Sequence, residues 1–126
     1  PKFVGVDRFG QEIVHARRQG QLNLSCAICH DDNAGKKLAG IAIPEAHPTG
    51  YPIYRLEWQA LGSLKRRLRN CLVGIRAEAW PLDAPEYTAL ELYLMERAKG
   101  ICPYVDLTKN NLTLNLAAVL DTPVTA

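Results

Sequence analysis

The stretch "CAICH", residues 26–30, carries two cysteines separated by two residues and followed at once by a histidine. This C-x-x-C-H spacing is the attachment pattern of a c-type haem. The thiols of Cys26 and Cys29 would form thioethers with the haem vinyl groups, and His30 would bind the iron from the proximal side. The motif therefore predicts one covalently bound haem c.

The two remaining cysteines do not complete a zinc site with the first pair. Cys71 and Cys102 lie about thirty residues apart, whereas a zinc site needs its second ligand pair at short spacing. The spacing thus favours haem over zinc or a redox dithiol. Because covalent haem attachment is completed outside the bacterial cytoplasm, we expect a periplasmic protein.

Composition indicates one globular domain. The chain has 126 residues, of which 48% are hydrophobic and 22% charged. The net charge of +2 is small and its cations are clustered, so nucleic acid is not an expected partner. No apolar run approaches the roughly 18 residues of a transmembrane helix, and we expect no signal peptide before Pro1. A start without Met predicts a processed or truncated chain.

Two helical segments flank the motif. A weak apolar stripe runs over residues 9–24, and "APEYTALELYLMERAKG" (84–100) has Pro85 in its first turn and a buried face predicted at Tyr87, Leu90, Leu94 and Ala98. Prolines and a glycine in "EAHPTGYP" (45–52) exclude regular structure there. We predict a mainly α, class I cytochrome c-like domain over residues 1–100. Residues 101–126 would form a C-terminal extension, docking on the domain or on a partner.

The second axial ligand of such a haem has three candidates. Met95 is the only methionine, but it falls inside the terminal helix, where core packing is its expected role. His47 lies in the proline-bound loop soon after His30, and it stays open as a ligand. Cys71 falls about fifteen residues before the terminal helix, where this fold delivers its distal ligand, and we favour it.

The segment "LKRRLRNC" (64–71) places cations directly before Cys71. If residues 55–72 are helical, an apolar face forms from Leu61, Leu64, Leu68 and Leu72. Cys71 then emerges at the edge of that face, and Arg67 lies one turn earlier on the same side, where it favours thiolate. The other cations, Lys65, Arg66 and Arg69, are expected on the solvent face. The alternative for Cys71 is a disulfide with Cys102.

Three segments resemble the C-terminal haem domain of the SoxA family of sulfur-oxidation cytochromes. They are "GQLNLSCAICHDDNAGKKLAG", "HPTGYPIYRLEWQALGSLKRRLRNCLVGIRAE" and "APEYTALELYLMERAKG". The resemblance implies His30 and Cys71 as axial ligands, Cys71 often as a persulfide, and Arg67 as an active-site residue. Arg76 also matches the family pattern.

The resemblance also implies a haem-dependent enzyme, an L-cysteine S-thiosulfotransferase. Its substrate would be thiosulfate, and its partners a SoxX-like monohaem cytochrome c and a SoxYZ-like carrier protein with an acceptor cysteine. Typical members carry an N-terminal cytochrome-like half that residues 1–6 cannot replace, and the tail after Gly100 differs from theirs. Two alternatives therefore stay open: an electron-transfer cytochrome subunit with a His/Cys-ligated haem, and a thiosulfate dehydrogenase that forms tetrathionate.

Overall fold

The computed structural model describes residues 5–101, which contain four helices and two small hairpins. The helices are α1 (Val6–His15), α2 (Cys26–His30), α3 (Leu64–Gly74) and α4 (Pro85–Ile101). The strands are β1 (Lys37–Leu38), β2 (Ile41–Ala42), β3 (Ile53–Arg55) and β4 (Ala60–Gly62). The predicted extension at 101–126, with Cys102, lies outside the described residues except for Ile101.

Helices α1 and α4 pack against each other and carry the core. Gly10 faces α4 so closely that a Cβ there would meet the backbone of Ala89 and the Cβ of Tyr93. The core cluster joins both helices to α2 through Ile13, Val14, Ala27, Leu90 and Leu94. Packing of the first helix on the last fits the class I cytochrome c plan, and the buried face predicted for residues 84–100 is confirmed.

The helix expected over residues 55–72 is wrong in its first half. Residues 53–62 form the antiparallel hairpin β3–β4, in which Ile53 pairs with Gly62. Gln59 takes a positive φ of 48° in the turn. Helix α3 begins only after Ser63, whose hydroxyl accepts a hydrogen bond from the Arg66 amide at 3.3 Å. Leu61 therefore lies on the hairpin with 66% of its surface exposed, instead of on the helical apolar face.

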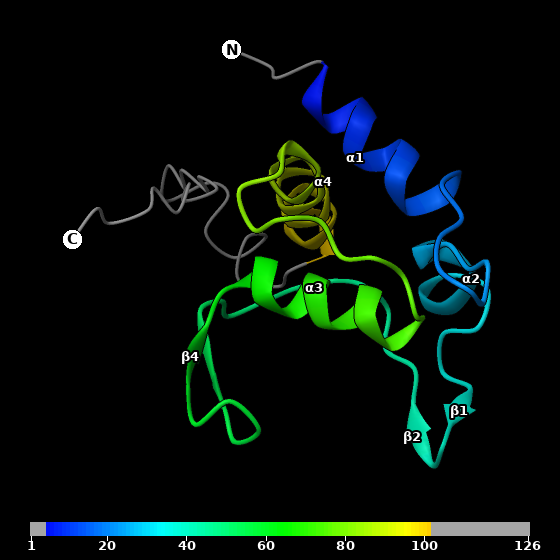
Figure 1. Cartoon of the computed structure of the whole chain (residues 1–126), viewed down its shortest axis with the longest axis vertical. Helices are drawn as coiled ribbons and strands as arrows, with labels where there is room; N and C mark the ends of the chain where they lie inside the picture. Colours follow the sequence, from blue (N-terminus) through cyan, green and yellow to red (C-terminus); the bar gives the residue numbers. More distant parts are fainter. Residues whose placement is uncertain (1–4, 102–126) are drawn as a thin grey trace.

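Both hairpins extend to the same side of α3 (Figure 1). The first joins β1 to β2 just after the haem motif, and the second leads directly into α3. The loop over 45–52 contains no helix or strand, as predicted. Within residues 5–101, every helix is too short or too polar to span a bilayer.

Candidate haem site

Helix α2 presents the motif residues to a shared cavity. Its amino end is capped by Ser25, whose hydroxyl accepts from the Ile28 amide at 3.4 Å. Cys26 and Cys29 are three residues apart and so share one face of the helix. Both thiols are half-buried, and both line the cavity together with His30.

The His30 ring is oriented by the loop that follows β2. Its Nδ1 lies 2.7 Å from the carbonyl oxygen of Pro44. A carbonyl can only accept, so Nδ1 carries the proton and donates it, and Nε2 keeps the lone pair that a metal ion needs. Metal-binding histidines are commonly oriented by such a hydrogen bond.

The residues that line the cavity fit the donor groups of a covalently attached haem. Apolar side chains from α1, α3, α4 and the flanking loops form most of its wall: Ile13, Leu24, Leu68, Leu72, Ile75 and Leu90. Two thiols for thioethers and an imidazole with a free lone pair stand in the same wall. Within residues 5–101, no cluster of three or more His, Cys, Asp or Glu side chains forms an alternative metal site. The donor set is therefore that of a c-type haem.

Cys71 enters this cavity from α3, on a different element from the motif. Its side chain is exposed because the cavity opens to solvent, yet burial of the sulfur among protein atoms raises the pKa of the Cys71 thiol. The guanidiniums of Arg67 and Arg55 lower the pKa of Cys71, and the charge of Cys29 raises it. Burial, followed by the charge of Cys71, raises the pKa of Cys26 to about 11. The three sulfurs thus lie close enough to influence one another.

The other candidate ligands lie outside the lining of this cavity. Met95 is half-buried within α4. His47 turns its Nδ1 toward the Glu45 carboxylate at 3.2 Å. Cys71 is a free thiol in the structure, and its expected alternative partner Cys102 is not among the described residues. Ligation by Cys71 stays a prediction that the geometry supports.

Arg67 and the other three cations of α3 lie on different faces of that helix. Arg67 is half-buried, and its charge acts on Cys71. Arg66 and Arg69 are not buried, as expected, and they line a different cleft. Lys65 was expected on the solvent face and is instead only 6% exposed, so that expectation is wrong. Its long aliphatic stem allows it to be buried in the wall of that cleft.

Arg55 is a cation whose charge acts on Cys71 and which the sequence did not reveal. It ends β3, and its Nε donates to the Glu57 carboxylate at 2.7 Å. The backbone amide of Glu57, followed by the charges of Arg55 and Arg67, lowers the pKa of this carboxyl below its usual value. Arg55 and Arg67 therefore stand on two elements near the same thiol. In a continuous helix Arg55 would lie about 24 Å from Cys71, since the rise is about 1.5 Å per residue.

A polar network behind the motif joins three helices. Arg97 of α4 donates from Nη2 to the Asp31 carboxylate at 2.9 Å, directly after His30. His15 of α1 lies 3.6 Å from the other Asp31 oxygen and 2.9 Å from the Tyr93 hydroxyl. This network fixes the carboxyl end of α2 against the α1–α4 pair, and with it the position of His30.

Known cytochrome c proteins are similar to this chain. The family model "SoxA/TsdA, cytochrome c domain" matches residues 10–102. The L-cysteine S-thiosulfotransferase subunits SoxA of Paracoccus pantotrophus and Allochromatium vinosum are 36% and 37% identical over 73% and 80% of this chain. The matches cover 31% and 36% of those proteins, so the chain spans about a third of their length.

A solved structure supports the same relationship. The crystal structure of SoxXA from P. pantotrophus has a TM-score of 0.68 and 34% sequence identity to this chain. The match covers 74% of this chain and 35% of the other. The class I cytochrome c fold expected from the sequence is thereby confirmed, together with the covalently bound haem c that such a domain carries.

Proposed function

Because this chain belongs to the SoxA/TsdA cytochrome c domain family, we propose that it is the C-terminal haem domain of a SoxA-like L-cysteine S-thiosulfotransferase. One observation carries the proposal: Cys71 stands in the wall of the haem cavity, within reach of the charges of Arg67 and Arg55. A plain electron-transfer site has no need of two cations beside an exposed cysteine.

The proposed site contains one haem c. Cys26 and Cys29 would attach it, and His30 would bind the iron through Nε2, the nitrogen that its hydrogen bond to Pro44 leaves free. Cys71 would supply the second protein ligand to the iron. A coordinating thiol is deprotonated outright, so ligation would overcome the burial that raises the pKa of this group.

The proposed reaction joins two sulfurs with loss of two electrons. Thiosulfate and a carrier-protein cysteine thiol give a cysteine S-thiosulfonate, one proton and two electrons. The new bond links the outer sulfur of thiosulfate to the cysteine sulfur, and no bond within thiosulfate breaks. When bound, the haem would supply the path by which the electrons leave.

The residues of this chain bind and orient the two reacting groups. Thiosulfate carries two negative charges, and a guanidinium binds such an anion with paired, charge-assisted hydrogen bonds. Arg67 and Arg55 supply two guanidiniums from separate elements, which favours the dianion over a singly charged competitor. Cys71 is an exposed residue, so both substrates would approach it from the solvent side.

The partners follow from the same proposal. The structural neighbour is SoxXA from P. pantotrophus, and we propose that a SoxX-like monohaem cytochrome accepts electrons from this domain. A SoxYZ-like protein carries the acceptor cysteine, and the complex works in the periplasm. A persulfide on Cys71, if it forms, would appear as one additional sulfur in the intact mass of the haem-loaded chain.

Thiosulfate-dependent reduction of the haem in the presence of the carrier tests the proposal. Arg67→Lys keeps the charge but loses the two-pronged hydrogen bonding, so turnover should fall by about 10- to 150-fold, the equivalent of roughly 1.5–3 kcal/mol. Arg66→Lys and Arg69→Lys are matched controls on the same helix and should change turnover by less than about threefold. Equal, small losses in all three variants would favour a simple electron-transfer cytochrome.

A further inference from the structure

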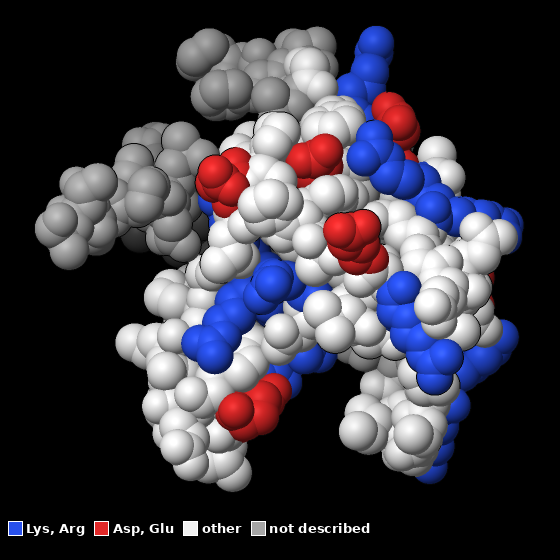
Figure 2. All heavy atoms as spheres, in the orientation of Figure 1, with Lys and Arg blue, Asp and Glu red and all other residues white. Residues whose placement is uncertain are grey.

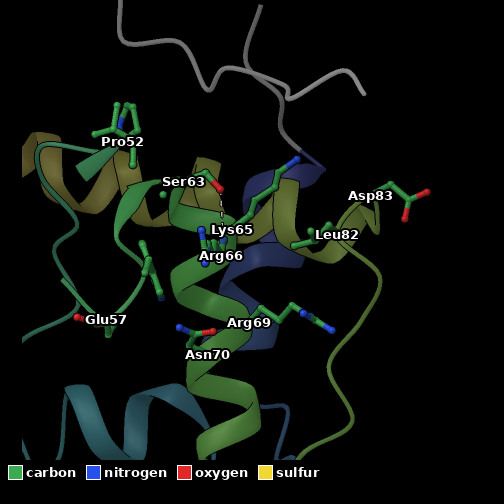
Figure 3. A pocket seen from close by; sticks show the side chains of 12 residues that line it. Pro52, Glu57, Ser63, Lys65, Arg66, Arg69, Asn70, Leu82 and Asp83 are labelled. Atoms are coloured by element: carbon green, nitrogen blue, oxygen red, sulfur yellow. Dashed lines mark hydrogen bonds between the residues drawn. The ribbon is translucent and has the colours of Figure 1, made fainter. Parts of the chain in front are cut away.

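A second cleft lies on the other side of α3 from the haem cavity. It has a volume of about 1200 Å³ and runs between the β3–β4 hairpin, α3 and residues 82–83 (Figure 3). Its lining includes Asn70 but neither Cys71 nor a residue of the C-x-x-C-H motif. The thiosulfotransferase proposal assigns it no role.

The cations of α3 give this cleft its charge. Lys65, Arg66 and Arg69 all line it, and Figure 3 shows them along the helix, with Glu57 across the cleft on the hairpin. The Glu57 carboxylate is ion-paired with Arg55 at 2.7 Å. The other carboxylate in the lining, on Asp83, points away from α3 in Figure 3. The cleft therefore presents an excess of positive charge, and Figure 2 shows Lys and Arg side chains over this face of the molecule.

An aromatic side chain forms part of the cleft wall. The Trp58 ring has the guanidinium carbon of Arg66 at 4.7 Å from its centroid and that of Arg55 at 5.5 Å. Gly62 packs against the ring, and a Cβ at this position would collide with Trp58. Leu61 and Leu82 add apolar surface, with 66% and 53% exposed. Trp and Arg side chains with exposed apolar neighbours are typical of the centres of protein interfaces.

We propose that this cleft is the docking site for an acidic segment of the protein that carries the acceptor cysteine. The inference rests on the proposed function and names the surface by which that partner is recognised. The cleft is far larger than a thiosulfate ion, and its mixed lining of cations, Trp58 and leucines matches a polypeptide rich in Asp and Glu. Its charge attracts such a segment and repels basic ones.

The position of the cleft explains how docking would serve the reaction. Asn70 lines the cleft, and the next residue, Cys71, lines the haem cavity. An α-helix with its side chains is about 10–12 Å across. A partner held in the cleft thus sits one helix width from the reacting sulfur, and a short mobile arm can pass over α3 to reach it.

Binding of the carrier protein from the same organism to the haem-loaded chain tests the proposal. The double variant Arg66→Glu/Arg69→Glu should weaken binding by at least about tenfold and flatten its dependence on ionic strength. The matched control is Arg18→Glu/Lys37→Glu, which changes the net charge equally at exposed positions outside the cleft. It should weaken binding by less than about threefold.

A second variant changes the shape of the cleft without changing its charge. Gly62→Ala displaces Trp58, so it should weaken carrier binding by about three- to tenfold while the salt dependence and the haem spectrum stay as in the parent chain. Equal losses in both charge-reversal pairs, or undiminished binding by Arg66→Glu/Arg69→Glu, would overturn the docking site.

The experiments distinguish failure of the proposed docking site from failure of the proposed function. If Arg66→Glu/Arg69→Glu loses affinity for the carrier but the parent chain never reduces its haem with thiosulfate and carrier, the docking site stands and the proposed function fails. If the parent chain turns over and the double variant keeps its full affinity, the function stands and the docking site is wrong.

Discussion

Replacing Gly10 by alanine should loosen the packing of α1 on α4. The added Cβ would lie 2.7 Å from the Tyr93 Cβ and 2.9 Å from the Ala89 carbonyl carbon, whereas carbon atoms pack at about 3.5–4.0 Å. The helices must therefore separate by about 1 Å, because the obstructing atoms belong to or adjoin the α4 backbone. Overpacking of this kind costs about 1–3 kcal/mol, and the higher helix propensity of alanine returns up to about 1 kcal/mol.

With the gain in helix propensity subtracted, the expected net loss is about 0–2 kcal/mol of unfolding free energy, or a melting temperature lower by up to roughly 10 °C. Urea unfolding of the haem-loaded chain, followed by far-UV circular dichroism, measures it. Gly74→Ala is the matched control, because Gly74 also lies in a helix but a Cβ added there would meet no packed neighbour within 4 Å. That control should be neutral or stabilised by up to about 1 kcal/mol.

The Gly10 result also bears on the haem site. Ile13 of α1 and Leu90 of α4 both line the cavity, so a wider separation of these helices should shift the haem absorption spectrum as well as stability. If Gly10→Ala unfolds at the same urea concentration as Gly74→Ala, the close approach of the helices is not as the structure has it.

Three further predictions concern the site itself. Arg55→Ala should raise the thiosulfate KM by about tenfold, because one of two cations is lost, whereas an unchanged KM would remove Arg55 from the site. Cys71→Ala should abolish the thiolate-ligated ferric spectrum and raise the reduction potential, because an anionic sulfur stabilises ferric iron; an unchanged spectrum would identify another ligand. Asp31→Asn should cost about 1 kcal/mol of stability by weakening its ion pair with Arg97, and equal stability of the variant would show that the pair contributes nothing.

The haem motif and the terminal helix could be predicted from the sequence because their signals are local. C-x-x-C-H fixes a chemistry within five residues. The segment 84–100 carries a helical apolar period, a proline at its start and a buried face at the expected positions, and the structure has α4 over Pro85–Ile101.

The hairpin before α3 was missed because an apolar period continued across it. Leu61 is spaced from Leu64 as in a helix, yet Gly62 and Ser63 lie between them and end the strand and cap the helix. A capping serine after a glycine was the signal that could have placed the boundary. The pairing of β3 with β4 depends on tertiary contacts that no local sequence pattern encodes. It brings the charge of Arg55 near the Cys71 thiol.

The sequence predicted in part which cations of α3 lie near Cys71 and which face solvent. The spacing of Arg67 and Cys71 by one turn correctly placed both on the same side, because i and i+4 share a helix face. Burial of Lys65 depends on the cleft formed with residues of the hairpin and of the segment after α3, and no local pattern encodes it.

The central claim is tested most directly by the product that forms on the carrier protein. Incubation of the haem-loaded chain and its cytochrome partner with thiosulfate and carrier should give a carrier cysteine with one thiosulfonate group by intact mass. Two electrons should appear in the acceptor for each modified cysteine. An unmodified carrier with tetrathionate in solution would contradict the account and identify a thiosulfate dehydrogenase instead.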